Sequence, residues 1–104
     1  MKELPMRLTD QQIRMIRELA HQVAGERCSI RVFGSRLDDT ARGGDIDLLL
    51  EVPDAVDNPA LLAARLSARI SRAMGGRKVD VIILAPNLRH LPIHDIALAE
   101  GRVL

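Results

Sequence analysis

The sequence predicts an α/β (α+β) fold in which helices flank a small mixed β-sheet. Segments with apolar residues at helical spacing alternate with short segments rich in β-favouring residues. Cap-forming residues, prolines and glycines separate these segments from one another. The 104 residues, of which 47% are hydrophobic and 28% charged, suffice for one modest core. We therefore expect a single domain over residues 1–104.

The first two elements are predicted from a cap, a helical period and a β-rich run. Thr9 and Gln12 match the capping-box pattern, and the apolar residues that follow recur at helical spacing until Gly25. A strand is expected over residues 29–33, which favour β-structure and run directly into a Gly-Ser pair. Ser35 begins another capping pattern, so a short helix could start there, with its free amides near the turn.

A second strand is predicted over residues 45–52, after a pair of glycines. Its residues alternate, so that one face carries two aspartates and the other face is apolar. Residues two apart on a strand point the same way, and Asp45 and Asp47 are therefore expected side by side. We expect the apolar face to be buried and the aspartate face to be partly functional.

The second half of the chain continues the alternation of helix and strand. Asn58 followed by Pro59 is typical of a helix start, and this helix is expected to end at Gly75. Residues 78–84 are predicted to form a third strand, with Asp80 as its only interior charge.

A short helix over residues 93–100 and an edge strand over residues 102–104 are expected to complete the fold. His90 and His94 lie four residues apart, but Pro92 between them argues against a shared metal site. The order of the strands in the sheet is not determined by the sequence.

Composition restricts the classes of function. Fifteen basic and fourteen acidic residues leave a formal net charge of +1, so a broad nucleic-acid surface is not expected. Cys28 is the only cysteine, which excludes an internal disulfide and fits a reducing cytosol. The longest apolar run, residues 81–85, is far shorter than the roughly 20 residues that cross a bilayer. We expect a cytoplasmic protein without membrane association.

Three carboxylates stand near the starts of two predicted strands: Asp45, Asp47 and Asp80. Adjacent carboxylates repel each other when both are ionised, unless a cation lies between them. If the two strands are neighbours, two metal ions bridged by these carboxylates and by phosphate oxygens could stabilise an in-line displacement. Oxygen ligands favour Mg²⁺, with Mn²⁺ as its usual substitute. Alternatively, the aspartates are solvent-facing residues of half-exposed strands.

The Gly-Ser turn has the features of a phosphate site. Gly34 lets the backbone approach a phosphate closely, Ser35 offers a hydroxyl, and amides at a helix start add positive potential. Arg36 and Arg42 lie in the same segment and could stabilise a departing pyrophosphate, although each could equally be a surface charge. We interpret these four residues as binding a nucleoside triphosphate; Ser35 could instead act only as a helix cap.

These segments resemble the DNA polymerase beta-like nucleotidyltransferase superfamily in its minimal, stand-alone form. Its motifs are matched by Phe-Gly-Ser-Arg at residues 33–36, Gly-Gly-Asp-Ile-Asp-Leu at residues 43–48 and Val-Asp-Val at residues 79–81. The resemblance covers the whole chain in outline. It implies the polymerase beta-like nucleotidyltransferase fold and a single minimal nucleotidyltransferase (MNT) domain over residues 1–104.

The resemblance also implies a reaction and a partner. The reaction is a magnesium-dependent transfer of a nucleoside monophosphate, expected to be AMP from ATP, with release of pyrophosphate. By the matching positions, Asp45 and Asp47 would bind both metal ions, while Asp80 would bind the catalytic ion and help to deprotonate the acceptor hydroxyl. Minimal members are often antitoxins that adenylylate a tyrosine of a HEPN-type toxin. The implied partner is such a toxin, with a homo-oligomer as a further option.

Two other functions stay open. The chain could be a protein-binding antitoxin that neutralises its partner by covering it, without any transfer. It could also transfer a nucleotide to a small molecule such as an aminoglycoside, as other relatives do. The three aspartates favour catalysis, because occlusion alone would not require a metal site, and the small size argues against a self-contained acceptor pocket.

Overall fold

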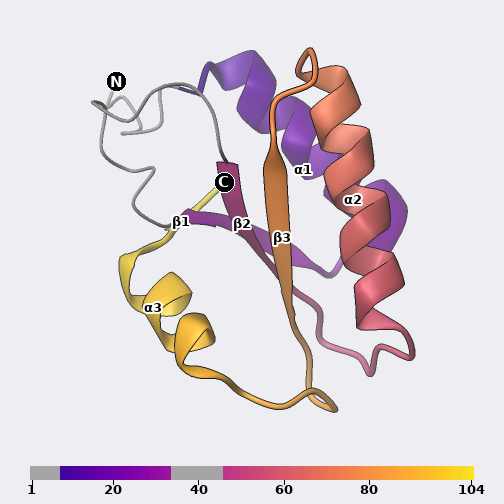
Figure 1. Ribbon diagram of the computed structural model, residues 1–104, viewed down its shortest axis with the longest axis vertical. Coiled ribbons are helices and arrows are strands. Elements are labelled where there is room, and N and C mark those ends of the chain that lie inside the picture. The colour runs from indigo at the N-terminus through magenta and orange to yellow at the C-terminus, as the bar shows by residue number, and fades with distance from the viewer. Residues whose placement is uncertain (1–7, 34–45) are drawn as a thin grey trace.

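The computed structural model describes residues 8–33 and 46–104 of the chain (Figure 1). In chain order its elements are α1 (Asp10–Ala24), β1 (Ser29–Phe33), β2 (Ile46–Glu51), α2 (Pro59–Ala73), β3 (Val79–Leu84), α3 (Pro92–Glu100) and β4 (Arg102–Val103). This alternation is the one that the sequence predicts. The short helix expected at Ser35 lies outside the described residues.

The helix α1 begins and ends at the predicted residues. Thr9 Oγ1 accepts a hydrogen bond from the Gln12 N–H at 3.0 Å, and Gln12 Oε1 accepts one from the Thr9 N–H at 3.0 Å, which completes the capping box. The helix ends at Gly25, whose φ of 93° favours glycine. Its inner face buries Ile16 and Ala20 completely.

The helix α2 connects the two strands that carry the candidate aspartates. The Asn58 side chain caps it by accepting a hydrogen bond from the Leu61 N–H at 3.1 Å, and Pro59 occupies the first turn. Its inner face buries Leu66 and Ile70. A helix of this length is the usual connection between neighbouring parallel strands, and it places β3 beside β2.

The four strands form one mixed sheet in the order β3-β2-β1-β4. β2 pairs with β3 in parallel, whereas β1 pairs antiparallel with both β2 and β4. The predicted edge strand at the C-terminal end is confirmed, although it is only two residues long. β3 forms the other edge of the sheet.

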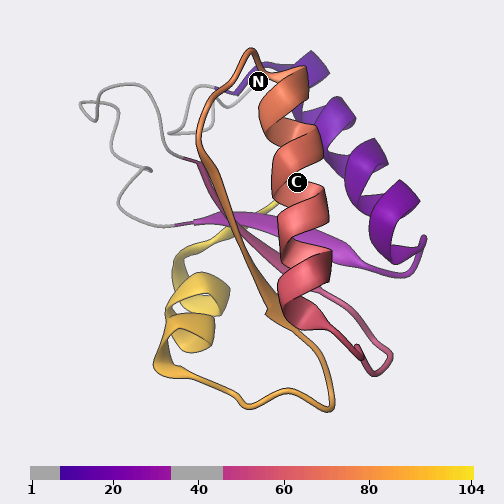
Figure 2. The same ribbon diagram turned by 45° about the vertical axis from the view of Figure 1, so that its right-hand side comes forward.

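Two unequal layers of helix cover the sheet (Figures 1 and 2). α1 and α2 lie together on one face, and α3 lies on the other. Between the sheet and the first pair is the main core, which includes Ile30, Val32, Ile46, Leu48, Leu50, Ile83, Ile16, Leu66 and Ile70. A smaller cluster lies under α3 and joins Phe33, Leu49 and Ala97.

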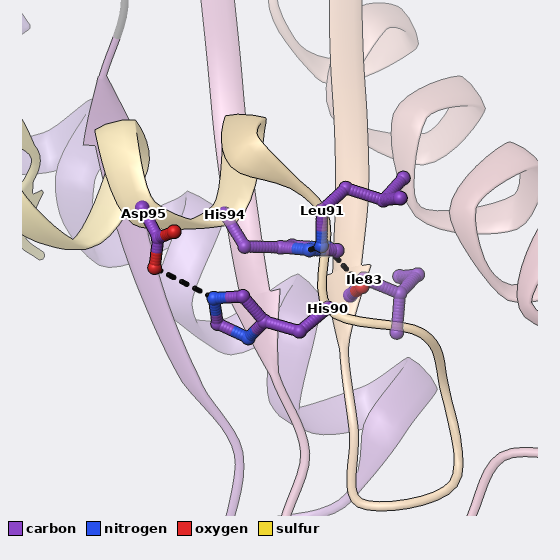
Figure 3. A network of polar contacts seen from close by, with 5 residues as sticks. All are labelled: Ile83, His90, Leu91, His94 and Asp95. Carbon is purple, nitrogen blue, oxygen red and sulfur yellow. Dashed lines mark hydrogen bonds and ion pairs between the residues drawn. The ribbon is translucent and has the colours of Figure 1, made fainter.

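A buried histidine ties α3 to the edge strand β3 (Figure 3). His94 is 4% exposed and uses both ring nitrogens. Its Nδ1 accepts a hydrogen bond from the Leu91 N–H at 2.9 Å, which leaves Nε2 to donate to the Ile83 carbonyl oxygen at 2.9 Å. These two bonds fix the tautomer and anchor the first turn of α3, which starts at Pro92, one residue before the predicted start.

No helix in the described part of the chain is long and apolar enough to cross a membrane.

Candidate active site

Two of the three candidate aspartates lie directly opposite each other. Asp47 is the second residue of β2, Asp80 is the second residue of β3, and the parallel register pairs them. Residues paired in this way project from the same face of a sheet, and neighbouring strands lie about 4.8 Å apart. The structure therefore brings the Asp47 and Asp80 side chains together, as the sequence predicts for neighbouring strands.

Phe33 extends this pair into a row across three strands. The antiparallel register places Phe33 of β1 opposite Asp47, so Phe33, Asp47 and Asp80 occupy one face; we call these three residues the aspartate row. Phe33 is 5% exposed, Asp47 is half-buried and Asp80 is exposed. The row thus changes from apolar to charged toward the sheet edge at β3.

The helix α3 determines how much of this face is open. Leu49, two residues beyond Asp47 and on the same face, is fully buried because it packs with Phe33 and Ala97. The sequence predicts a partly functional face but does not show that a helix covers its middle. Among the described residues on this face of β1, β2 and β3, Asp80 is the exposed one, whereas Asp47 and Glu51 are both half-buried.

The electrostatics of the pair favour a bound cation. The Asp80 side chain has no hydrogen bond or ion pair with any residue in the described part of the chain. Two carboxylates opposite each other on neighbouring strands repel when both are ionised. Oxygen donors that converge on one exposed surface fit Mg²⁺ or Mn²⁺. Among the described residues no group of three ligand-type side chains gathers, and Asp45 lies outside them.

The remaining predicted site residues also lie outside the described residues; they are Gly34, Ser35, Arg36 and Arg42. Their attachment to the fold is nevertheless defined on both sides. β1 ends at Phe33 and β2 begins at Ile46, and Phe33 is opposite Asp47. The segment that carries the Gly-Ser pair is therefore connected to the sheet at the aspartate row.

A surface cavity of about 520 Å³ lies at the opposite end of the sheet. Its lining includes Ser29, Glu51 and Leu84, which belong to the last register pairs of the strands rather than to the aspartate row. Arg27, also in the lining, is paired with Asp54 at 2.6 Å. Among the described residues, Glu51 is the only carboxylate in this lining, so the lining does not repeat the pairing of two carboxylates at the aspartate row.

Comparison with known proteins gives a result only at the level of structure. No family model matches the sequence, and no curated protein matches it. A tri-AMPylated HEPN toxin of Shewanella oneidensis in complex with MNT antitoxin aligns with a TM-score of 0.65 and 18% identity, covering 92% of this chain and 71% of that chain. The chain has the MNT nucleotidyltransferase fold.

Two further complexes show the same MNT fold. The toxin–antitoxin complex MntA–HepT aligns with a TM-score of 0.61 and 17% identity, over 91% of this chain and 70% of that chain. A toxin–antitoxin complex with AMP-PNP aligns with a TM-score of 0.62 and 18% identity, over 92% and 72%. The resemblance inferred from the sequence motifs is thus confirmed as a shared fold.

Proposed function

We propose that this chain is a magnesium-dependent nucleotidyltransferase that transfers AMP from ATP to a hydroxyl of a partner protein, and that it acts as an antitoxin. The proposed acceptor is a tyrosine of a HEPN-type toxin. Residues 1–104 would act as one minimal nucleotidyltransferase domain in the cytoplasm.

The observation that carries this proposal is the register of Asp47 with Asp80. By this register the half-buried Asp47 and the exposed Asp80 share one face of the sheet, at the row where the segment with Gly34 and Ser35 joins. The MNT fold adds support, because similar structures include an AMPylated toxin complex and a complex with AMP-PNP.

Each proposed site residue has a distinct role. Asp45 and Asp47 would hold two Mg²⁺ ions, and Asp80 would hold one of them. Gly34 and Ser35 would bind the triphosphate through backbone amides and a hydroxyl. When bound, the magnesium ions supply charge neutralisation for the phosphate oxygens.

The proposed reaction is an in-line displacement at phosphorus. The acceptor hydroxyl oxygen forms a bond to the α-phosphorus of ATP, and the bond from that phosphorus to the oxygen bridging to the β-phosphate breaks. Pyrophosphate leaves, and Arg36 and Arg42 would stabilise its charge. The hydroxyl proton passes to the Asp80 carboxylate, which is exposed and therefore accessible to a protein acceptor.

Intact-mass spectrometry tests this proposal directly. A HEPN-type toxin protein is incubated with the chain, Mg²⁺ and ATP. We expect its mass to rise by one or more adenylate groups, and we expect the D47N variant to abolish the change. The variant E51Q alters a carboxylate at the far end of the same strand face and should leave transfer intact.

The same assay separates the two alternatives. A HEPN-type protein that is neutralised and bound by the chain, but whose mass does not change, would establish occlusion in place of transfer. An aminoglycoside that gains an adenylate group while the protein stays unmodified would establish a small-molecule acceptor.

A further inference from the structure

The outer edge of β3 is a strand edge that runs beside the candidate site. β3 is the last strand of the sheet on this side, so one side of its backbone pairs with β2 and the other side does not. In Figure 1, β3 is drawn in front of β2, and no other helix or strand passes in front of it. Burial agrees with this position, because only Val79 and Ile83 are buried among its six residues.

The parallel ladder determines which backbone groups point outward. The Ile46 N–H donates to the Lys78 carbonyl at 3.0 Å, and the Val52 N–H donates to the Leu84 carbonyl at 2.9 Å. In a parallel pair the bonding residues alternate, so residues 78, 80, 82 and 84 bond to β2. The N–H and C=O groups of Val79, Val81 and Ile83 therefore point away from the sheet.

One end of this edge is already closed. His94 donates from Nε2 to the Ile83 carbonyl oxygen, which occupies the outward group farthest from the aspartates. In the described part of the chain, no residue bonds to the outward groups of Val79 or Val81. The open portion is therefore the half of the edge on either side of Asp80.

We propose that the edge of β3 at Val79 and Val81 docks an extended segment of the acceptor polypeptide, which adds to the sheet as a further strand. This inference rests on the proposed function and specifies how the acceptor is held. Backbone hydrogen bonds to an added strand give affinity without a deep pocket. They would bring a hydroxyl-bearing residue alongside Asp80.

The α3 end of the β3 edge indicates which way the docked segment runs and which residues it carries at each end. Leu91, whose N–H is bonded to His94, is 43% exposed, and Ile93, in the first turn of α3, is exposed as well. A segment that pairs with Val79 and Val81 would extend toward these apolar side chains. We therefore expect an acceptor segment that is apolar at the α3 end and carries its hydroxyl at the Asp80 end.

The variant V81P tests the open edge. Proline removes the outward N–H of Val81, and its ring obstructs an added strand, but the β2–β3 ladder does not use that N–H. V81A is the matched control, because it shortens the same side chain and retains the N–H. For both variants the melting temperature is measured with and without magnesium-ATP, and then kcat/KM is measured for adenylate transfer to the HEPN-type protein.

We expect V81P to retain the rise in melting temperature with magnesium-ATP and to lose at least about tenfold in kcat/KM for the protein acceptor. V81A should stay within about twofold of the wild type. Wild-type transfer rates in a folded V81P variant would overturn the inference while leaving the proposed function standing. The absence of transfer by the wild type would instead contradict the proposed function.

Amide hydrogen exchange on the wild type covers the case in which V81P does not fold. The Val81 amide should exchange quickly in the free chain and at least about tenfold more slowly when the HEPN-type protein is added without ATP. An unchanged rate would overturn the inference. A free chain that sediments as a dimer, with this amide already protected, would show that a second copy occupies the edge, which also contradicts it.

Discussion

Cys28 is a buried thiol whose ionisation affects the stability of the whole chain. It is 6% exposed, and its Sγ donates to the Ala20 carbonyl oxygen at 3.6 Å. Burial raises the pKa of the Cys28 thiol above its ordinary value of 9.0, and a backbone hydrogen bond opposes this only partly. The thiol therefore stays protonated in the folded chain at a pH where it ionises in the unfolded chain.

This difference predicts a loss of stability at alkaline pH. Because the folded pKa is the higher one, the contribution is fully present below pH 9.0 and is lost as the pH rises toward the folded pKa. In that window the free energy of unfolding should fall by up to about 1.4 kcal/mol per pH unit. Urea unfolding at pH 7 and pH 10 measures the difference in the free energy of unfolding between the wild type and C28A. This difference should be smaller at pH 10 than at pH 7, and an equal difference at both pH values would contradict the expected effect of Cys28.

For the two carboxylates, Asp47 and Asp80, the alternation of residues along a strand predicts the face of the strand but not the neighbouring residue. The period of two along a strand predicts that Asp47 shares a face with Leu49 and Glu51, and the structure agrees. The same rule places Asp80 on a face of its own strand, but it does not say which strand lies beside it. Asp47 pairs with Asp80 only because β2 and β3 are neighbours in this register, and the sequence does not determine that they are.

At the scale of the element, α3 depends on a histidine for both its start and its position. Leu91 N–H and the Ile83 carbonyl each have His94 as their hydrogen-bond partner. Exposed His90, by contrast, makes a hydrogen bond through Nε2 to the Asp95 carboxylate at 2.7 Å, near the surface. The ring centroids of the two histidines lie 5.3 Å apart, yet only His94 bonds to backbone groups that position α3 in the described part of the chain.

We therefore expect H94A to destabilise the fold far more than H90A. H94A leaves two backbone groups without partners and creates a cavity, which should cost about 2–4 kcal/mol. H90A removes one exposed hydrogen bond, to Asp95, and should cost about 0–1 kcal/mol. Chemical denaturation of the two variants measures the difference. Equal losses would mean that His94 does not hold α3 in place.

Element bounds were predictable where a cap signal is local. Thr9 with Gln12, and Asn58 with Pro59, predict the starts of α1 and α2, and the structure confirms both. The start of α3 was predicted one residue late. The capping role of His94 was missed, because a histidine at this position is not one of the usual cap signals and its second bond is to a distant strand.

At the scale of the whole molecule, the order of the strands could not be predicted. The sequence indicates a mixed sheet, but the order β3-β2-β1-β4 depends on pairing between segments far apart in the chain, and two helices cover one face of this sheet and one covers the other. Leu49 is buried under α3, and at one end of the same face Asp80 is exposed and Asp47 is half-buried. The Gly-Ser part of the candidate site lies outside the described residues and stays a prediction.

Ligand-linked thermal stability tests the shared site of Asp47 and Asp80 most directly. A ligand at about one hundred times its Kd stabilises the folded state by about 2.7 kcal/mol, which corresponds to a rise on the order of 10 °C for a chain of this size. We expect this rise for the wild type with magnesium-ATP, and its loss when the magnesium is chelated.

The variant D80N makes the measurement decisive, with E51Q as the matched control at the other end of the same face. Without ligand, D80N should be as stable as the wild type or up to about 1 kcal/mol more stable, because opposed like charges are removed. With magnesium-ATP, its melting temperature should not rise, whereas that of E51Q should rise as in the wild type. An equal rise in D80N and the wild type would contradict a metal-nucleotide site built on this pair.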